Sequence, residues 1–522
     1  MPLPSRSWSV AGGARVPGRA SAWTYGVLLV LATGIGAWLR TLGVGEWALW
    51  VDEAFTWRDA TMPLDQFVRA DRVWYSLPFQ LLRALLRLGW IGEDPRSLRL
   101  PFLVVGTLTV PLLALCGRRL VGVWPALLAA WLLALHPWHV FWSQSARGYA
   151  LVVAAAVLAA NRADAYFAGR RLRDLLALAL ALAVAATSHP TAWLLAVAVV
   201  AFVALRRVPR WRAPWVAGLL LAGCAFAMTL PYIGSWLPFE AFRKSKHDVS
   251  LLHFVQTSAY YFRPTMLLAA AVGALTAVSV LGTARTLLLA CFSLVPFLVL
   301  SAVGFKFAKA TARYALCALP ALLWLAAFAS VQLASVARRW QGSRGFGVAA
   351  GALVAALLFG EQLVALYGYH TEQRGQRAAY DVAVDALHRR AAGRPLRVLT
   401  VAKPILLYYL RPGSYADEVP EQFAKNQVWP IEEWMFGPGH GEDGKTPIHA
   451  PGAAAHLQWH HERAAADGAL LGVVVTMPEL VEHDPSGAFR SELERRFELV
   501  QHLPCWVGPK DESVHVYVER RP

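Results

Sequence analysis

The stretch "YGVLLVLATGIGAWL" (residues 25–39) has no charged side chain, and comparable runs recur along the chain. They include "ALLAAWLLAL" (126–135), "LALALALAVAA" (176–186), "LLAVAVVAFVAL" (194–205) and "GVAAGALVAALLFG" (347–360). The 522 residues are 57% hydrophobic and 16% charged, with a mean hydropathy of +0.41. Average soluble proteins carry about 25% charged residues, and a membrane helix needs about 20 apolar residues. The composition therefore predicts a polytopic α-helical membrane protein.

We expect about eleven transmembrane helices. They are predicted at 22–42, 99–117, 122–138, 148–167, 174–188, 190–206, 214–232, 264–282, 285–303, 314–334 and 346–367. The first has no clear small-residue cleavage site after it, and more spans follow, so we interpret it as an uncleaved helix rather than a signal peptide.

The net charge of +16 reflects basic clusters between the predicted spans, which indicates topology and not nucleic-acid binding. The clusters are Arg6, Arg15 and Arg19, then 117–120, 169–173, 206–212, Arg285 and 337–344. All of them fall on one side if consecutive spans form hairpins. By the positive-inside rule that side is cytoplasmic. We therefore expect a protein of the cytoplasmic (inner) membrane whose acidic loop and C-terminal region lie outside.

The first external loop contains "LDQFVRADRVWYSLPFQLLRALLRLGW" (64–90), where arginines interrupt apolar residues at near-helical spacing. This pattern favours an amphipathic helix lying in the interface. The alternative is a short tilted span, which would invert the topology of every later segment.

Hydropathy falls sharply after residue 370, and the polar tail alternates strand-like and helix-like segments. Strands are predicted at 397–401, 472–476 and 515–519, helices at 377–391 and 489–500, and long irregular loops across 411–462. The predicted organisation is a cytoplasmic N-terminal tail (1–21), a transmembrane catalytic domain (22–368) and an extracytoplasmic soluble α/β domain (369–522).

Charged residues near membrane spans are costly, so those outside the basic clusters need an explanation. They occur at Asp52 and Glu53, and within 96–101, 136–150, 187–190 and 305–314, all on the predicted outer face. Two carboxylates facing several cations suggest an acid or base opposite an anion-binding cradle, as a phosphate leaving group requires. The alternative is that the basic residues of 305–314 extend toward lipid phosphates.

Several segments together resemble the polyprenyl-phosphate-sugar transferases of glycosyltransferase family 39, which includes protein O-mannosyltransferases and lipid A aminoarabinose transferases. The segments are "WVDEAFTW" (50–57), "SLRLPFLVVGTLTVPLLALCGRRLVG" (97–122), "HPWHVFWSQSARGYAL" (136–151), "TSHPTAWLL" (187–195) and "ARYALCALPAL" (312–322). The resemblance implies a GT-C fold, an external active site, an acidic base in the first external loop and a sugar donor carried on a lipid phosphate.

The resemblance assigns the catalytic role to Asp52, with Glu53 orienting it or substituting for it. Repulsion between the adjacent carboxylates would raise the pKa of one of them. The cations Arg147, Lys306, Lys309 and Arg313 would hold the phosphate, and a single displacement would invert the anomeric centre.

Further candidate substrate-binding residues are Arg58, Tyr75, Arg99, Gln144, Tyr149, His189 and Tyr314. The two tyrosines at span starts, Tyr149 and Tyr314, are alternatively interfacial anchors, and His189 alternatively makes a structural hydrogen bond. The family's usual His-Pro sequence after the acidic loop is missing around Tyr75, which leaves substrate identity open.

The sequence identifies no cofactor with certainty. A divalent metal is a possible cofactor. The pair His456 and His460 could bind zinc, but a solvated helix face is the simpler interpretation. Expected partners are a polyprenyl-phosphate-linked sugar donor, a lipid, glycan or protein acceptor, and membrane lipids, with no nucleic acid. A transporter or lipid flippase is the alternative function, which would place charges near mid-span and show inverted repeats. A structural assembly protein that binds through its tail is a third class, but it would not need the acidic pair.

Overall fold

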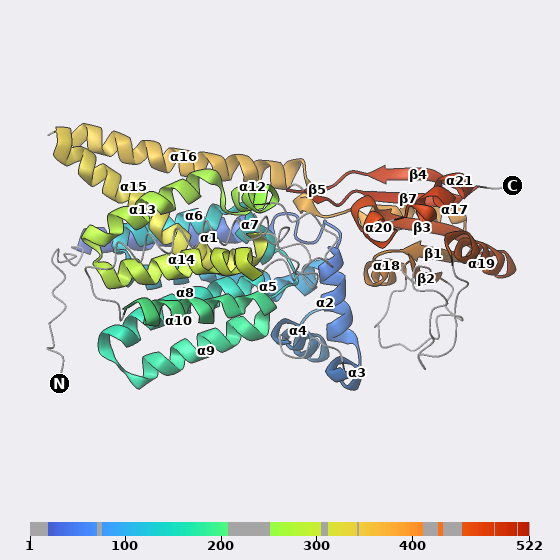
Figure 1. Cartoon of the computed structure of the whole chain (residues 1–522), viewed down its shortest axis with the longest axis horizontal. Helices are drawn as coiled ribbons and strands as arrows, with labels where there is room; N and C mark the ends of the chain where they lie inside the picture. The colour runs from blue at the N-terminus through green and yellow to red at the C-terminus, as the bar shows by residue number, and fades with distance from the viewer. Residues whose placement is uncertain are drawn as a thin grey trace, which may run out of the picture.

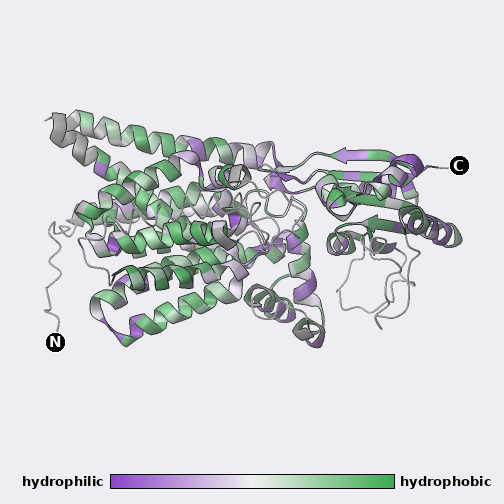
Figure 2. Ribbon diagram, in the orientation of Figure 1, coloured by the Kyte–Doolittle hydropathy of each residue, from purple (hydrophilic) through white to green (hydrophobic). Residues whose placement is uncertain are grey.

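The computed structural model describes residues 19–69, 76–206, 251–303, 312–341, 344–410, 426–431, 452–484, 486–508 and 510–520. A long helical bundle forms one end of the molecule and a smaller part with a β-sheet forms the other (Figure 1). The bundle helices consist mostly of hydrophobic residues, whereas polar residues gather between the two parts and on the tail (Figure 2). Many of the apolar side chains in the bundle are exposed, among them Val30, Leu108 and Val364. An apolar outer surface is expected of helices that face lipid.

The bundle contains helices at ten of the eleven predicted spans, and the segment 214–232 lies outside the described residues. They are α1 (Arg19–Thr41), α5 (Pro95–Leu120), α6 (Val123–Leu135), α8 (Tyr149–Gly169), α9 (Leu172–Ser188), α10 (Trp193–Arg206), α13 (Pro264–Val280), α14 (Thr283–Val303), α15 (Leu319–Gln341) and α16 (Arg344–Thr371). Among described helices, six can cross a membrane by length and composition, or up to eight if each bent pair is one span. The chain is therefore a multi-pass membrane protein, and the number eleven stays a prediction.

Two of the spans are broken close to a proline. Helix α6 meets α7 (Pro137–Ser143) at an angle of 62°, and α12 (Leu251–Phe262) meets α13 at 87°. Proline has no N–H to continue the helical ladder and restricts the residue before it, so each break is placed by Pro137 or Pro264.

The first loop of the bundle forms three short helices, α2 (Val51–Thr61), α3 (Leu64–Arg69) and α4 (Leu77–Arg87). With 11 residues, α4 is too short to cross a bilayer. Its apolar side buries Phe79 and Leu82, and Arg83 donates a hydrogen bond to the backbone oxygen of Asp59 at 2.7 Å. The loop thus contains a short amphipathic helix as predicted, and its location in the membrane interface stays a prediction.

Ion pairs join helix ends at the face of the bundle remote from the tail. The carboxylate of Asp164 on α8 accepts from Arg119 on α5 at 2.6 Å and from Arg285 on α14 at 3.2 Å. Arg162 and Asp174 join α8 to α9 at 3.1 Å. Two predicted basic clusters, 117–120 and Arg285, thus meet at one end of the bundle, and the side of the membrane they occupy stays a prediction.

The tail forms a five-stranded sheet in the order β2-β1-β3-β7-β4. Strands β2, β1 and β3 are parallel to one another, and β7 lies between β3 and β4 and is antiparallel to both. Its strands are β1 (Leu396–Thr400), β2 (Asn426–Pro430), β3 (Leu470–Thr476), β4 (Phe497–Leu503) and β7 (Val514–Glu519), with a small hairpin of β5 (Trp506–Val507) and β6 (Lys510–Asp511). Its helices are α17 (Tyr380–Ala391), α18 (Lys403–Leu410), α19 (Ala453–Ala466), α20 (Met477–His483) and α21 (Ala488–Arg496).

The three predicted strands are present, but two tail predictions need correction. The predicted helix 489–500 ends at Arg496, because Phe497 begins a strand that pairs with β7. The region 411–462 is not wholly irregular, since β2 and the first part of α19 lie within it.

Close packing of α13 on α15 generates the first prediction. A Cβ atom added at Gly273 would lie 2.0 Å from the backbone oxygen of Leu325, so Gly273→Leu must push the two helices apart. We expect a loss of about 1–3 kcal/mol of stability. Thermal unfolding of the purified protein in detergent measures it. The control is Gly34→Leu on α1, where a Cβ meets nothing within 4 Å, and equal melting temperatures for the two variants would contradict the prediction.

Candidate active site

The start of α2 places two adjacent carboxylates in different surroundings. The side chain of Glu53 turns back to cap the helix, and one of its oxygens accepts from the N–H of Trp50 at 2.9 Å. Its side chain is 0% exposed, whereas that of Asp52 is 33% exposed. Only Asp52 is therefore open to a substrate.

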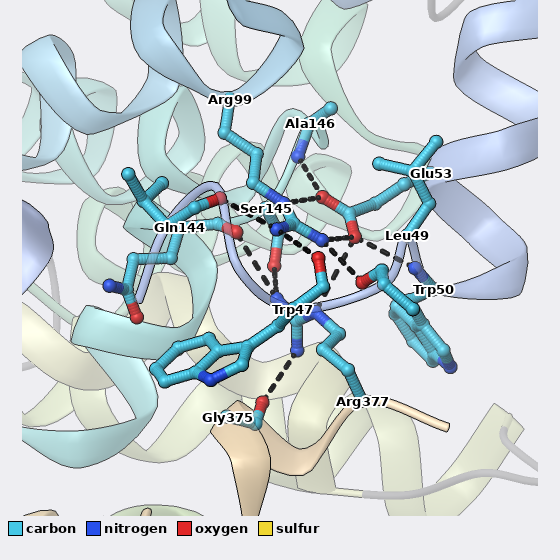
Figure 3. Close-up of polar contacts among 12 residues, drawn as sticks. Trp47, Leu49, Trp50, Glu53, Arg99, Gln144, Ser145, Ala146, Gly375 and Arg377 are labelled. Carbon is cyan, nitrogen blue, oxygen red and sulfur yellow. Dashed lines mark hydrogen bonds and ion pairs between the residues drawn. The ribbon is translucent and has the colours of Figure 1, made fainter. Parts of the chain in front are cut away.

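Four N–H groups donate hydrogen bonds to the Glu53 carboxylate, two from Arg99 and one each from the backbones of Trp50 and Ala146. These contacts are drawn in Figure 3. Arg99 on α5 binds both carboxylate oxygens, at 2.9 and 2.8 Å, which is the bidentate geometry that suits a guanidinium. The N–H of Ala146 donates to the other side of the carboxylate at 2.8 Å. The remaining N–H groups of Arg99 bind the carbonyl oxygens of Val44, Trp47 and Ala48, so this one pair fixes the turn that leads into α2.

A second arginine reaches Glu53 from beyond the last membrane helix. Arg377 follows η6 (Arg374–Gln376), and its Nε lies 3.4 Å from the Glu53 carboxylate. Its guanidinium lies over the Phe141 ring at 3.9 Å and donates to the hydroxyl of Ser145. The site therefore includes a residue from the start of the tail.

These contacts determine the protonation of Glu53. Burial by itself would raise the pKa, but the charges of Arg99 and Arg377 and the hydrogen bonds outweigh it and lower the pKa to about 2. The predicted rise in the pKa of one carboxylate is thus wrong for Glu53. An ionised carboxylate whose oxygens are all bound to donors is a poor base, so the contacts of Glu53 favour a role in positioning α2.

Asp52 faces a cation. The Arg147 guanidinium lies 4.0 Å from the Asp52 carboxylate and also contacts the Asp52 backbone oxygen at 3.4 Å and the Thr56 hydroxyl at 3.2 Å. The Nε atom of Arg147 is buried without a hydrogen-bond partner. This leaves donor capacity beside the exposed carboxylate.

Arg313 and three aromatic rings surround the same place. Arg313 opens η5 (Ala312–Ala318), donates to the Tyr314 hydroxyl at 2.8 Å and lies over the Trp50 ring at 5.7 Å. The ring of His189 lies 4.2 Å from that of Tyr149 and 6.0 Å from that of Tyr314. The structure thus brings together six residues from four separate segments, namely Asp52, Arg147 with Tyr149, His189, and Arg313 with Tyr314.

His189 is neutral in this setting. Burial, with the neighbouring charges of Arg147 and Arg313, lowers the pKa of His189 well below its ordinary value. Its Nδ1 accepts from the N–H of Thr191 at 3.2 Å, which places the ring proton on Nε2. The ring is thus a hydrogen-bond donor and not a further cation.

Other predicted binding residues have different roles or lie elsewhere. Arg99 is fully buried on Glu53, and Gln144 is buried with its amide on the Leu42 carbonyl at 2.7 Å and its oxygen on the Tyr369 hydroxyl at 2.7 Å. Arg99 and Gln144 are therefore structural residues and not the predicted substrate contacts, because every polar atom of their side chains is bound within the protein. Arg58 pairs with Asp59 at 2.7 Å. Tyr75, Lys306 and Lys309 lie outside the described residues.

Two arginines in this region were missed by the sequence interpretation. Arg40, at the end of the first span, is fully buried and binds Ser143, His139 and the carbonyls of α6. A lone arginine at the outer end of an apolar span is a signal that could have identified it. Arg377 gives no such signal, because arginines are common throughout the polar tail.

The described residues contain no group of three or more His, Cys, Asp or Glu side chains that could hold a metal ion. His456 and His460 are both fully buried, their rings are 4.6 Å apart, and Arg397 donates to His460 at 3.0 Å. The interpretation of these histidines as a solvated helix face was therefore wrong, and they belong to the core of the tail.

Comparison with known proteins agrees with this architecture. Residues 78–234 match the family model described as dolichyl-phosphate-mannose-protein mannosyltransferase. No curated protein matches. The apo structure of ArnT from Cupriavidus metallidurans is similar at a TM-score of 0.51 and 14% identity, over 96% of this chain and 98% of that one.

The archaeal oligosaccharyltransferase AglB from Archaeoglobus fulgidus, solved with an inhibitory peptide and a dolichol-phosphate, gives a TM-score of 0.53 at 11% identity, over 95% of this chain and 74% of that one. A complex of the Archaeoglobus fulgidus oligosaccharyltransferase with Zn and sulfate gives 0.52 at 13% identity, over 93% and 72%. The chain therefore has the fold of GT-C glycosyltransferases. With the family match, this confirms the resemblance noted in the sequence.

The buried carboxylate generates a stability prediction. Glu53→Gln replaces one oxygen by an NH₂ group, which must then face either Arg99 and Ala146 or Arg99 and Trp50, all of them donors. It also leaves two buried arginines without a counter-charge. We expect a loss of about 3–5 kcal/mol. Thermal unfolding measures it, with Asp52→Asn as the adjacent, exposed control, and a loss below that of the control would contradict the assignment.

The ionised Glu53 carboxylate predicts that the folded protein loses stability in acid. Because the pKa of Glu53 is about 2 in the folded chain and 4.5 ordinarily, its contribution is complete above pH 4.5 and is lost as the pH falls from about 4.5 toward 2. The loss amounts to about 3 kcal/mol. Melting temperatures of the wild type and of Glu53→Gln between pH 6 and 3 should therefore converge in acid, and parallel curves would contradict the prediction.

Proposed function

We propose that this chain is a membrane glycosyltransferase that moves a sugar from a polyprenyl-phosphate donor to an acceptor hydroxyl outside the cytoplasmic membrane. The observation that carries the proposal is the exposed carboxylate of Asp52 facing Arg147 and Arg313, while Glu53 beside it is fully bound. The GT-C fold supports it, as does the dolichol-phosphate present in one structure of similar fold.

In this proposal Asp52 is the base. It takes the proton of the acceptor hydroxyl as the acceptor oxygen forms a bond to the anomeric carbon. The bond from that carbon to the phosphate oxygen breaks, and the polyprenyl phosphate leaves as an anion. Because the base and the leaving group lie on opposite faces of the sugar, the anomeric configuration inverts.

The phosphate needs stabilisation rather than protonation, because it is already a good leaving group. Arg147 and Arg313 supply it, and each has a buried Nε without a hydrogen-bond partner. Lys306 and Lys309 are proposed to add charge. No step in this scheme requires a metal.

The rings of Tyr149, His189 and Tyr314 are proposed to contact the donor. A neutral His189 with its proton on Nε2 can donate to a sugar or phosphate oxygen without adding charge. The positive-inside pattern supports an external site and an external tail domain (369–522). The acceptor class, whether lipid, glycan or protein, and the identity of the sugar are left open by this proposal.

Replacing Asp52, the proposed base, should impair catalysis and leave the stability of the protein nearly unchanged. Asp52→Asn should lower transfer by about 10²–10⁴-fold with little change in melting temperature, because the side chain is one-third exposed. Mass spectrometry of lipid extracts should then show the sugar-linked polyprenyl phosphate accumulating in cells that carry the variant. The mass of that lipid also identifies the sugar.

The matched control is Asp65→Asn, an exposed aspartate in α3 of the same loop, which should leave the lipid profile unchanged. Normal glycan modification in cells carrying a folded Asp52→Asn protein would rule out this base. Arg147→Gln should remove stabilisation of the leaving phosphate and therefore lower kcat more than it raises the KM for the donor.

A further inference from the structure

Both broken spans of the bundle meet at one cavity of about 500 Å³. Pro137 and Trp138 come from the break between α6 and α7, and Tyr260 and Arg263 come from the break between α12 and α13. Helix α16 lines the cavity from Gly360 to Tyr369, and Glu372 and Gln373 just after the helix extend this wall. Helices α7, α12 and α16 lie together at the tail end of the bundle (Figure 1). Irregular backbone at membrane depth is tolerated where it lines a cavity, and broken membrane helices commonly form ligand sites.

The backbone at the second break is unusual. Arg263 has φ +65° and ψ 131°, a conformation that a residue with a side chain rarely adopts. Such conformations persist where the surroundings hold them, and they cluster at ligand sites. The result is that a long cationic side chain lies at the cavity wall.

The cavity wall carries two hydrogen-bond donors without a partner and two carboxylates. The Nε of Arg263 and the indole N–H of Trp138 are buried without a hydrogen-bond partner. Glu361, on α16, accepts from the backbone N–H and the hydroxyl of Thr265, and Glu372 lies about three turns further along the chain. A ligand that matches this wall carries an anionic group for the donors and a cationic group for the carboxylates, both within one polar head group.

The cavity also adjoins the lipid-facing side of α16. Val364 lines it and is 74% exposed, in a bundle whose exposed apolar residues face hydrocarbon. A Cβ atom added at Gly360 in the wall would meet nothing within 4 Å, so the space beside it is open. An acyl chain could therefore lie along α16 while its head group occupies the polar end.

We propose that this cavity binds a zwitterionic phospholipid with a primary ammonium, of the phosphatidylethanolamine type. Its phosphate accepts from Arg263 and Trp138, and its ammonium donates to Glu361 and Glu372. Phosphatidylglycerol lacks the cation, and phosphatidylcholine has the cation but no N–H to donate. The site is separate from Asp52 and does not depend on the proposed transferase activity.

Native mass spectrometry of the full-length protein in detergent tests the proposal. The protein is titrated with phosphatidylethanolamine, phosphatidylglycerol, phosphatidylcholine and a polyprenyl phosphate. We expect one phosphatidylethanolamine to be retained at a concentration about tenfold below that needed for the other two phospholipids. Arg263→Gln should weaken its retention about tenfold, and Glu361→Gln should remove the preference over phosphatidylcholine.

Filling the cavity provides the matched pair. Gly360→Trp should abolish retention, whereas Gly34→Trp, in equally open space on the lipid face of α1, should not. Equal retention of the three phospholipids, or wild-type retention by Gly360→Trp and Arg263→Gln, would overturn the proposal. Displacement of phosphatidylethanolamine by the polyprenyl phosphate would overturn it as well, and would assign the cavity to the donor lipid.

Discussion

One buried carboxylate organises the end of the helical bundle that adjoins the tail. Glu53 accepts from Arg99, Trp50 and Ala146 and pairs with Arg377, so it joins the start of α2, helix α5, the turn before α8 and the beginning of the tail. Taking such charges out of water is costly, and the cost is offset only where geometry and hydrogen bonding are complete. The arrangement leaves Asp52 as the exposed member of the acidic pair, with its backbone held on a fixed helix. This cluster therefore fixes the position of Asp52, the proposed base, in addition to any effect on stability.

The sequence predicted the fold well where hydropathy is decisive. Ten expected spans coincide with helices, and the strands around Val398, Val474 and Val516 are present, because long apolar runs and short β-branched runs are strong local signals. The end of α21 was misplaced because the strand after it depends on pairing with β7, a partner distant in sequence. The break after Arg263 lies at Pro264, a local signal, but no local pattern predicts its angle of 87°.

The candidate site could be located from the sequence but not divided into roles. Asp52 and Glu53 are adjacent and chemically alike, and only the position of Arg99 decides which of them is buried. Gln144 and Arg99 looked like ligand-binding residues because they are polar groups near a membrane face, yet their partners are backbone carbonyls far away in the chain. Low identity to the structures of similar fold, 11–14%, fits a fold kept by helix packing while individual contacts differ.

The position of Arg377 has a consequence for biosynthesis. A membrane protein is made and inserted from its N-terminus, so the acidic loop emerges early, together with Arg99. Arg377 follows α16 and leaves the ribosome only when the bundle has been synthesised. Until then the Glu53 cluster lacks one of its two cations, and the Ser145 hydroxyl lacks its donor. Assembly of the complete Glu53 cluster is thereby tied to synthesis of the segment that follows α16.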